Sequence, residues 1–232
     1  MGTLYLVGTP IGNLEDITLR ALRVLREVSL IAAEDTRTTR KLLSHYDIHT
    51  PLTSYHDYSG PGKLRRLIER LADEDVALVS EAGMPGLSDP GYPLVAAALA
   101  QGVMVTTAPG PSAAVSALVL SGLPTHAFHY LGFLPRKPGP RRKLLARVAA
   151  DPDTLLMYES PHRLVAALRD VDEVLGPRQV AVARELTKRF EEVLRGSVGE
   201  VRAHFERTPP RGEFTVVISG SGADTGDADE PA

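Results

Sequence analysis

The sequence contains no cysteine and no tryptophan among its 232 residues. A chain without thiols forms no disulfide and offers no thiolate metal ligand, which suits a reducing compartment, although compositional bias explains the absence equally well. No uninterrupted apolar run approaches the ~18 residues expected of a membrane-spanning helix. The first residues show no basic segment ahead of an apolar one, so we expect no secretory signal and a cytoplasmic protein.

Acidic residues are missing from a long central stretch. The formal net charge is −3, which does not by itself indicate a nucleic-acid-binding protein. However, no acidic residue occurs between Asp89 and Asp151, and this stretch holds a concentrated basic segment. Its members are Arg136, Lys137, Arg141, Arg142, Lys143 and Arg147. Such a segment attracts phosphates regardless of sequence, so we expect it to contact RNA, the alternative being a solvated helix face. The Pro-Gly-Pro run at 138–140 indicates an exposed loop, which favours contact.

Short apolar runs alternate with helical patterns along the first half of the chain. Strands are expected at 4–7, 30–33, 76–79 and 103–106. A helical pattern follows each of these runs, and Asp16 or Thr18 is suited to cap the first helix. Strands joined by crossover helices predict a mostly parallel α/β sheet. In such sheets, ligands bind beyond the carboxyl ends of the strands.

A second, shorter series of strands and helices follows Gly122. Its expected strands lie at 130–133, 155–158, 180–183 and 214–218. We therefore predict an N-terminal α/β domain over 1–122 and a C-terminal α/β domain over 123–220. The last residues, 221–232, hold Asp224, Asp227, Asp229 and Glu230 among Gly, Ala and Pro, so we expect a disordered acidic tail.

The segments after the strands carry seven short motifs. They are GTPIGNLEDIT (8–18), AEDTR (33–37), VSEAGMPGLSDPGYP (79–93), PGPSA (109–113), ESPHR (159–163), RELTK (184–188) and GEFTVVI (212–218). Together and in this order they resemble the tetrapyrrole methylase superfamily, over about residues 3–218. Within it, the TPIGN form of the first loop is similar to the branch that methylates a cytidine 2′-hydroxyl in small-subunit ribosomal RNA. Members that methylate tetrapyrroles usually carry a GxGxG loop there.

The resemblance implies two α/β domains of the tetrapyrrole methylase type, with S-adenosylmethionine bound in the cleft between them, and a homodimer. No metal is expected. We expect the donor to contact Pro10, Gly12, Glu81, Gly83, Ser88 and Ser112. Two residues depart from the family pattern, because Glu81 stands where Asp is usual and Met84 where Thr is usual. The stretch at 54–60 also differs from the composition expected in the family, and we assign no site residue to it.

Methyl transfer to a ribose hydroxyl needs alignment, together with a base or a cation near the oxygen. The candidates for this work are Asp35, Arg37, Glu185 and Lys188. Asp35 or Glu185 is suited to act as base, and Lys188 to lower the pKa of the hydroxyl or to hold a phosphate. The alternative for all four is a network of ion pairs.

The expected RNA contacts are Arg136, Lys137, Arg141, Arg142, Lys143 and Arg163, with Phe128, Tyr130 and Phe133 as residues that could stack on a base. The expected partner is small-subunit ribosomal RNA or the assembled subunit. Two other functions stay open. One is a methyltransferase acting on a tetrapyrrole or another small acceptor, and the other is a catalytically silent RNA-binding protein, for which Glu81 and Met84 give slight support.

Overall fold

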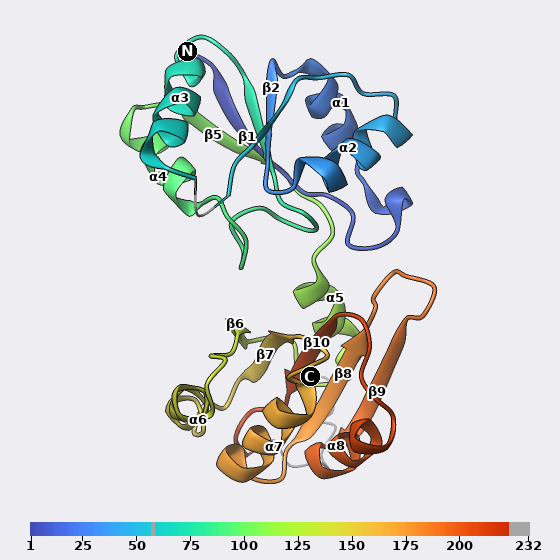
Figure 1. Cartoon of the computed structure of the whole chain (residues 1–232). Coiled ribbons are helices and arrows are strands. Elements are labelled where there is room, and N and C mark those ends of the chain that lie inside the picture. The colour runs from blue at the N-terminus through green and yellow to red at the C-terminus, as the bar shows by residue number, and fades with distance from the viewer. Residues whose placement is uncertain (57–58, 223–232) are drawn as a thin grey trace, which may run out of the picture. The chain divides into compact units, whose positions relative to one another are not determined.

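The computed structural model of the chain describes residues 1–56 and 59–222 (Figure 1). The chain divides into two compact units, Met1–Ser112 and Ala113–Ala232. Both combine helices with a five-stranded sheet. Within the described ranges, no helix has the length and apolar character needed to cross a membrane.

The first unit is a parallel sheet with helices on both faces (Figure 1). Its strands lie in the order β3-β2-β4-β1-β5, and every neighbouring pair is parallel. The elements are β1 (Thr3–Val7), η1 (Leu14–Asp16), α1 (Leu19–Glu27), β2 (Leu30–Ala33), α2 (Thr36–His45), β3 (Leu52–Ser54), α3 (Pro61–Leu71), β4 (Val76–Val79), α4 (Tyr92–Ala100) and β5 (Met104–Ala108). Thr18 caps α1, because its Oγ1 accepts a hydrogen bond from the Ala21 N–H at 3.1 Å.

The inner strands β2 and β4 are apolar and buried throughout, because both faces of the sheet are covered there. Successive side chains of a strand point to opposite faces. Ile31 and Ala33 of β2 pack in one core with α1 and α2, whereas Leu30 and Ala32 pack in the other with α3 and α4. The sequence prediction of buried strands with crossover helices is confirmed for this unit, and all the strands end at the same edge of the sheet.

The second unit contains a mixed sheet in the order β6-β7-β10-β8-β9. Strand β10 is antiparallel to both β7 and β8, β9 is antiparallel to β8, and β6 is parallel to β7. The elements are α5 (Ala113–Ser121), β6 (Phe128–Phe133), α6 (Pro138–Arg147), β7 (Thr154–Glu159), α7 (Leu164–Leu175), β8 (Gln179–Arg184), β9 (Glu192–Ser197), α8 (Val198–Arg207) and β10 (Phe214–Ile218). Helices α6, α7 and α8 share one apolar core with Leu155 and Met157 of β7.

Helix α5 belongs to the second unit, so the chain divides after Ser112, whereas the sequence placed the boundary after Gly122. This helix contacts β7, β8 and β10. Arg195 of β9 also donates a hydrogen bond from Nε to the carbonyl oxygen of Leu120, at 3.1 Å. The acidic tail expected over 221–232 lies outside the described residues from position 223 onward.

The Pro-Gly-Pro run at 138–140 is the first turn of helix α6 and not the exposed loop expected from the sequence. Proline is well suited to this place, because the first N–H groups of a helix have no partner within the helix and the φ of proline is already helical. Helix α6 therefore begins at Pro138, with the whole run inside it.

A buried carboxylate connects α6 to α7. Asp170 accepts hydrogen bonds from the Nε of Arg141 at 2.6 Å and from the Nε of Arg142 at 2.7 Å. The side chains of Arg141 and Asp170 are each only 4% exposed. Arg142 also contacts Glu173, and that pair is half-exposed.

We expect Asp170→Asn to lower the free energy of unfolding by ~3–5 kcal/mol, because it leaves the Arg141 cation buried without its counter-ion. Chemical denaturation of the two proteins measures the loss. The matched control is Glu173→Gln, which breaks an ion pair in solvent and should cost at most ~1 kcal/mol. Equal losses for the two variants would show that Arg141 does not depend on Asp170.

Candidate functional site

Three loops meet at the carboxyl edge of the first sheet. The loops that follow β1 and β4 are joined by a short antiparallel bridge, in which the Thr9 N–H donates to the Gly83 oxygen at 2.9 Å and the Gly83 N–H donates to the Thr9 oxygen at 3.0 Å. The Gly8 N–H donates to the oxygen of Ala108, the last residue of β5, at 2.9 Å. We call the loop after β1 (8–18) the first loop, the loop after β4 (80–91) the third and the loop after β5 (109–112) the fourth. Hydrogen bonds therefore hold the first and third loops together directly, and they tie the first loop to the start of the fourth.

Two glycines allow the first and fourth loops to approach so closely. A Cβ added to Gly8 would lie 2.7 Å from the Gly110 Cα and 2.7 Å from the Met84 sulfur. A Cβ added to Gly110 would lie 2.9 Å from the Gly8 Cα. No side chain fits between these backbones, so glycine is required at both positions. Met84, which departs from the family pattern, fills space at this contact.

The third loop has an unusual backbone. Gly83 and Gly86 have φ values of 77° and 85°, and Ser88 has a φ of 61°. A non-glycine residue in the left-handed region costs about 1–3 kcal/mol, and such residues cluster at ligand sites. The Oγ1 of Thr9, in the adjoining loop, is buried and has no hydrogen-bond partner among the described residues. This edge of the sheet thus combines strained backbone with an unused polar group.

Glu34, Asp35 and Arg37 follow β2 at the same edge. Asp35 caps α2, because its Oδ1 accepts a hydrogen bond from the Arg37 N–H at 2.7 Å. Its carboxylate also forms an ion pair with the Arg37 guanidinium at 2.9 Å. Glu81 of the third loop links to this segment, since its N–H donates to Glu34 Oε2 at 3.4 Å and its Oε1 accepts from Thr38 at 3.5 Å. Asp35 and Arg37 therefore hold each other at the start of the helix.

Asp35 is expected to titrate at an unusually low pH. Hydrogen bonds from the Arg37 side chain and backbone lower the pKa of Asp35 to about 2. We expect Arg37→Ala to raise this pKa towards its ordinary value, because the side-chain hydrogen bond is lost. Carboxyl chemical shifts followed by NMR as a function of pH measure both midpoints. Glu15→Gln leaves this pair untouched and serves as the control, and an unchanged midpoint in Arg37→Ala would contradict the assigned cause.

In the second unit, Lys188 lies between two carboxylates in the turn after β8. Its Nζ donates to Glu185 Oε1 at 2.9 Å and to Glu213 Oε2 at 2.8 Å. The Glu213 N–H also donates to Glu185 Oε1, at 3.0 Å. Glu185 and Thr187 have φ values of 50° and 66°, both in the left-handed region. The turn is held in a strained conformation that fixes the ammonium group of Lys188.

The hydrogen bonds of this turn decide the charge of each group. Burial disfavours the charged form of Lys188, but hydrogen bonds to Glu213 and Glu185 outweigh it and raise the pKa of the lysine. Burial likewise opposes ionisation of Glu185, yet the hydrogen bonds from Lys188 and from the Glu213 N–H lower the pKa of this carboxyl. At neutral pH, Lys188 is a cation and Glu185 an anion. Lys188 is therefore suited to stabilise negative charge and not to take a proton.

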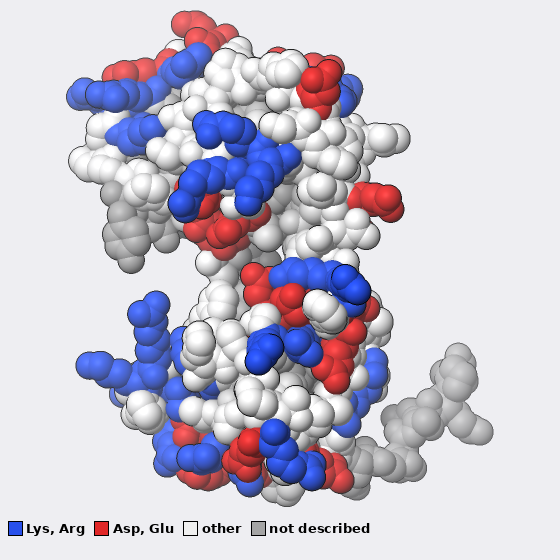
Figure 2. Space-filling view, turned by 45° about the vertical axis from the view of Figure 1, so that its right-hand side comes forward, with Lys and Arg blue, Asp and Glu red and all other residues white. Residues whose placement is uncertain are grey.

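The basic segment divides into exposed and structural residues. Arg136, Lys137, Arg142 and Lys143 are exposed, although Arg142 is paired with Asp170 and Glu173. Arg141, expected among the RNA contacts, is buried in its ion pair with Asp170 and presents no charge to a ligand. In Figure 2, Lys and Arg side chains project from the side of the second unit that carries α6.

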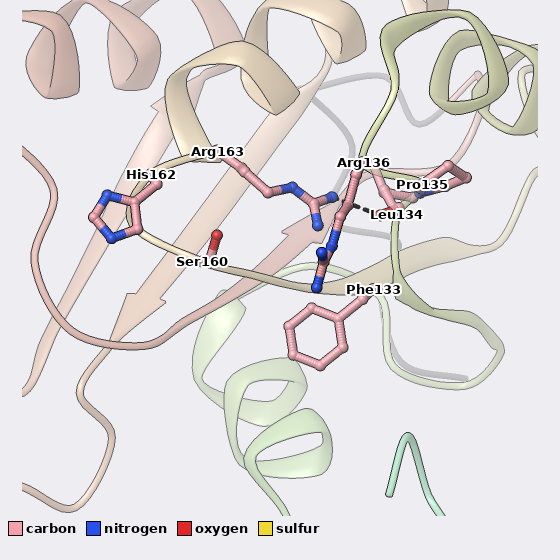
Figure 3. A pocket seen from close by; sticks show the side chains of 7 residues that line it. All are labelled: Phe133, Leu134, Pro135, Arg136, Ser160, His162 and Arg163. Carbon is pink, nitrogen blue, oxygen red and sulfur yellow. Dashed lines mark hydrogen bonds between the residues drawn. The ribbon is translucent and has the colours of Figure 1, made fainter. Parts of the chain in front are cut away.

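A pocket within the second unit brings part of this segment together with the ESPHR motif (Figure 3). Arg136 and Phe133, from the end of β6, line it together with Ser160, His162 and Arg163 from the start of α7. Arg163 is held by its Nη2, which donates to the Leu134 oxygen at 2.5 Å and to Glu159 Oε2 at 3.1 Å. Thus two expected RNA contacts, Arg136 and Arg163, line one pocket.

Sequence reasoning missed three residues of these sites. Glu213 completes the Lys188 turn, and its place in the GEFTVVI motif was the available signal. Thr9 and Gly110 lie inside motifs that were singled out, but their roles depend on contacts between loops that are far apart in sequence. In the described part of the chain, no group of three or more His, Asp or Glu side chains is placed to hold a metal ion.

The first unit is thus a parallel α/β sheet with glycine-bearing loops at its carboxyl edge, where ligands bind in such sheets. The family described as Tetrapyrrole (Corrin/Porphyrin) Methylases matches residues 3–202. The chain belongs to this family and is a methyltransferase, so the predicted family is confirmed.

Curated relatives match nearly the whole chain. A Halalkalibacterium halodurans protein is 51% identical over 95% of this chain and 77% of its own length, and one from Thermotoga maritima is 49% identical over 95% and 99%. Both are named ribosomal RNA small subunit methyltransferase I.

Solved structures show the same fold at lower identity. Cobalt precorrin-4 methyltransferase is 16% identical, with a TM-score of 0.71 and 94% of each chain covered. Uroporphyrin-III-C-methyltransferase from Thermus thermophilus is 24% identical, with a TM-score of 0.63 and 94% of each chain covered. The predicted fold class, two α/β domains of the tetrapyrrole methylase type, is thereby confirmed.

Proposed function

We propose that this chain transfers a methyl group from S-adenosylmethionine to the 2′-hydroxyl of a cytidine in small-subunit ribosomal RNA, in the cytoplasm. The observation that carries the proposal is the shared name of relatives that are 49–52% identical over 95% of the chain. The motifs that bear on this function lie among the residues that the structure describes.

The loops of the first unit fit the donor. We assign donor contacts to three loops of the first unit. The residues are Pro10 and Gly12 of the first loop, Glu81, Gly83 and Ser88 of the third loop, and Ser112 at the end of the fourth loop. The close approach of Gly8 to Gly110 brings backbone within reach of a ligand, and the unpartnered Thr9 hydroxyl can donate or accept a hydrogen bond. When bound, the sulfonium of the donor supplies an electrophilic methyl group, so the protein needs no metal for the chemistry.

The protein must align the ribose hydroxyl and stabilise charge on its oxygen. We assign the stabilisation to Lys188, whose charge is secured by Glu185 and Glu213. Glu185 acts as a positioning residue in this proposal, because its carboxylate is already occupied by Lys188 and the Glu213 N–H. Asp35, with its pKa of about 2, is a weak base, and we propose that Asp35 and Arg37 orient the start of α2 and the ribose near it.

We also propose a homodimer. Strand β5 is the edge of the first sheet, and it exposes Met104, while the neighbouring α4 exposes Leu99 and Tyr92. Exposed apolar side chains beside an open strand edge are typical of an interface. Sedimentation equilibrium gives the molecular mass, and a monomer at all concentrations would contradict this part of the proposal.

The exposed lysines of the basic segment should determine the salt dependence of RNA binding. We expect Lys137→Gln and Lys143→Gln each to reduce the slope of log affinity against log salt by about one. Fluorescence anisotropy with a labelled fragment of small-subunit RNA measures the slopes. The control is Arg207→Gln, an exposed cation on α8 outside the segment. Slopes that match the wild-type value in both lysine variants would remove this segment from the interface.

Methyl incorporation tests the function directly. Small ribosomal subunits from a strain that lacks the gene are incubated with labelled S-adenosylmethionine and the protein, and the nucleosides are analysed by mass spectrometry. We expect 2′-O-methylcytidine. Donor binding without transfer to subunits or naked RNA would instead favour a small acceptor such as a tetrapyrrole, and RNA binding without donor binding would favour a catalytically silent protein.

A further inference from the structure

The pocket at the carboxyl ends of β6 and β7 combines an exposed aromatic residue with two of the expected RNA contacts. It is lined by Phe133, Leu134, Arg136, Ser160, His162 and Arg163, which we call the Phe133 pocket. Phe133 is 55% exposed, although phenylalanine normally loses most of its surface to the core. An exposed ring next to two guanidinium groups is unfavourable as a packing arrangement and favourable as a binding surface.

A bulge in β6 places the ring there. The register with β7 shifts between Tyr130 and Gly132, and Gly132 has a φ of 63°. In a regular strand, residues three positions apart point to opposite faces. Here the rings of Tyr130 and Phe133 both contact Tyr158, with centroids 5.4 Å and 5.5 Å from it. The bulge therefore turns Phe133 to the face of Tyr158, and bulges with this effect are common beside functional sites.

The two arginines of the pocket are held differently. Arg163 is fixed by the Leu134 oxygen and by the buried Glu159 carboxylate, but its Nε is buried with no hydrogen-bond partner in the described ranges. The Arg163 side chain is nevertheless 22% exposed, so part of its guanidinium group remains accessible to a ligand. Arg136 is exposed, and Figure 3 shows its side chain extending towards the ring of Phe133. The pocket thus offers one fixed and one adaptable donor beside an aromatic surface.

We propose that the Phe133 pocket binds one nucleotide of the RNA, with the base stacked on Phe133 and the adjoining phosphate held by Arg136 and Arg163. This proposal depends on one part of the proposed function, namely that the substrate is RNA. Single-stranded RNA is bound by this combination, because every base has a face that stacks on an aromatic ring and every nucleotide carries a phosphate. All the residues that line the pocket belong to the second unit, whereas the residues assigned to the donor belong to the first.

Photocrosslinking and binding together test the proposal on the full chain. The probe is a short single-stranded RNA that carries 5-iodocytidine, and mass spectrometry locates the crosslink. We expect it on Phe133. We also expect Phe133→Leu to weaken binding of this RNA about fivefold or more with an unchanged salt slope, and Phe133→Tyr to restore it. Arg136→Gln should lower the salt slope by about one.

The matched control is Phe190→Leu, in the turn between β8 and β9, where the side chain is 64% exposed but does not line the pocket. This variant should bind and crosslink as the wild type does. Wild-type affinity in Phe133→Leu, or a crosslink that maps outside the pocket, would overturn the proposal while leaving methyl transfer to subunits intact. If instead no methyl transfer to subunits occurs but the crosslink maps to Phe133, the proposed function is overturned and the assignment of the pocket stands.

Discussion

Replacing Gly8 by alanine is expected to weaken S-adenosylmethionine binding by about 100-fold, because displacements of about 1 Å at a positioned site have effects of this size. The new Cβ would lie 2.7 Å from the Cα of Gly110, so the first and fourth loops must separate. The obstructing atoms belong to backbone and to Met84, and backbone cannot rotate out of the way. Overpacking of this kind also costs about 1–3 kcal/mol of folding stability.

Isothermal titration with S-adenosylmethionine measures the affinity, and thermal denaturation shows that the variant is folded. Gly62→Ala is the matched control, since a Cβ at that position in α3 meets nothing within 4 Å. Gly110→Ala should reproduce the loss from the other side of the contact, where its Cβ lies 2.9 Å from the Gly8 Cα. A folded Gly8→Ala protein with wild-type affinity would show that the donor does not depend on these loops.

The sequence was sufficient to predict the centre of the first sheet because strands β2 and β4 are buried on both faces. Apolar runs such as Leu30–Ala33 and Val76–Val79 have no other stable location in a protein of this size. The short edge strand β3 follows a proline and has two half-buried residues and an exposed one. It was not predicted, since its position depends on pairing with β2. The donor-site motifs could be located for the same reason, as they follow the predicted strands.

The second unit was harder to predict because its local signals are weaker. Strand β9 (Glu192–Ser197) has no apolar alternation and exists through its antiparallel pairing with β8. Helix α8 was also missed, although Ser197 and Glu200 form a capping box, which was a readable signal for its start. Helix α5 is apolar on all sides, so the sequence could not indicate to which sheet it belongs.

Side-chain roles depended most on contacts that sequence spacing does not reveal. Arg141 and Lys143 look equivalent in the basic segment, yet one is buried against Asp170 and the other is exposed. The difference follows from the 3.6-residue repeat of α6 and from the carboxylate that α7 happens to place opposite it. The bulge at Gly132, which decides where Phe133 lies, likewise results from pairing between β6 and β7.

Replacing Lys188 by methionine is expected to lower the rate constant of methyl transfer by about 100- to 1000-fold, the usual effect of removing one group that stabilises a developing oxyanion. Donor affinity should not change, because the donor contacts are assigned to the first unit. The pKa of Lys188 is raised by its carboxylate partners, so the wild-type enzyme keeps this charge throughout the neutral range and above it. Loss of this proton should therefore not lower the wild-type rate in mildly alkaline solution.

Single-turnover transfer to small subunits with saturating donor isolates the chemical step. Lys188→Arg keeps a cation at the site and should recover part of the rate. If Lys188 only supported the fold, recovery would not depend on restoring a positive charge. Glu213→Gln is the more informative companion, because it removes one of the two carboxylates while Glu185 remains. The pKa of Lys188 should fall in Glu213→Gln. If Lys188 acts through its charge, the rate of this variant then declines at a lower alkaline pH than the wild-type rate. If instead Lys188→Met transfers methyl groups at the wild-type rate, the cation that stabilises the oxygen must be sought elsewhere, with Arg37 at the start of α2 as the next residue to replace.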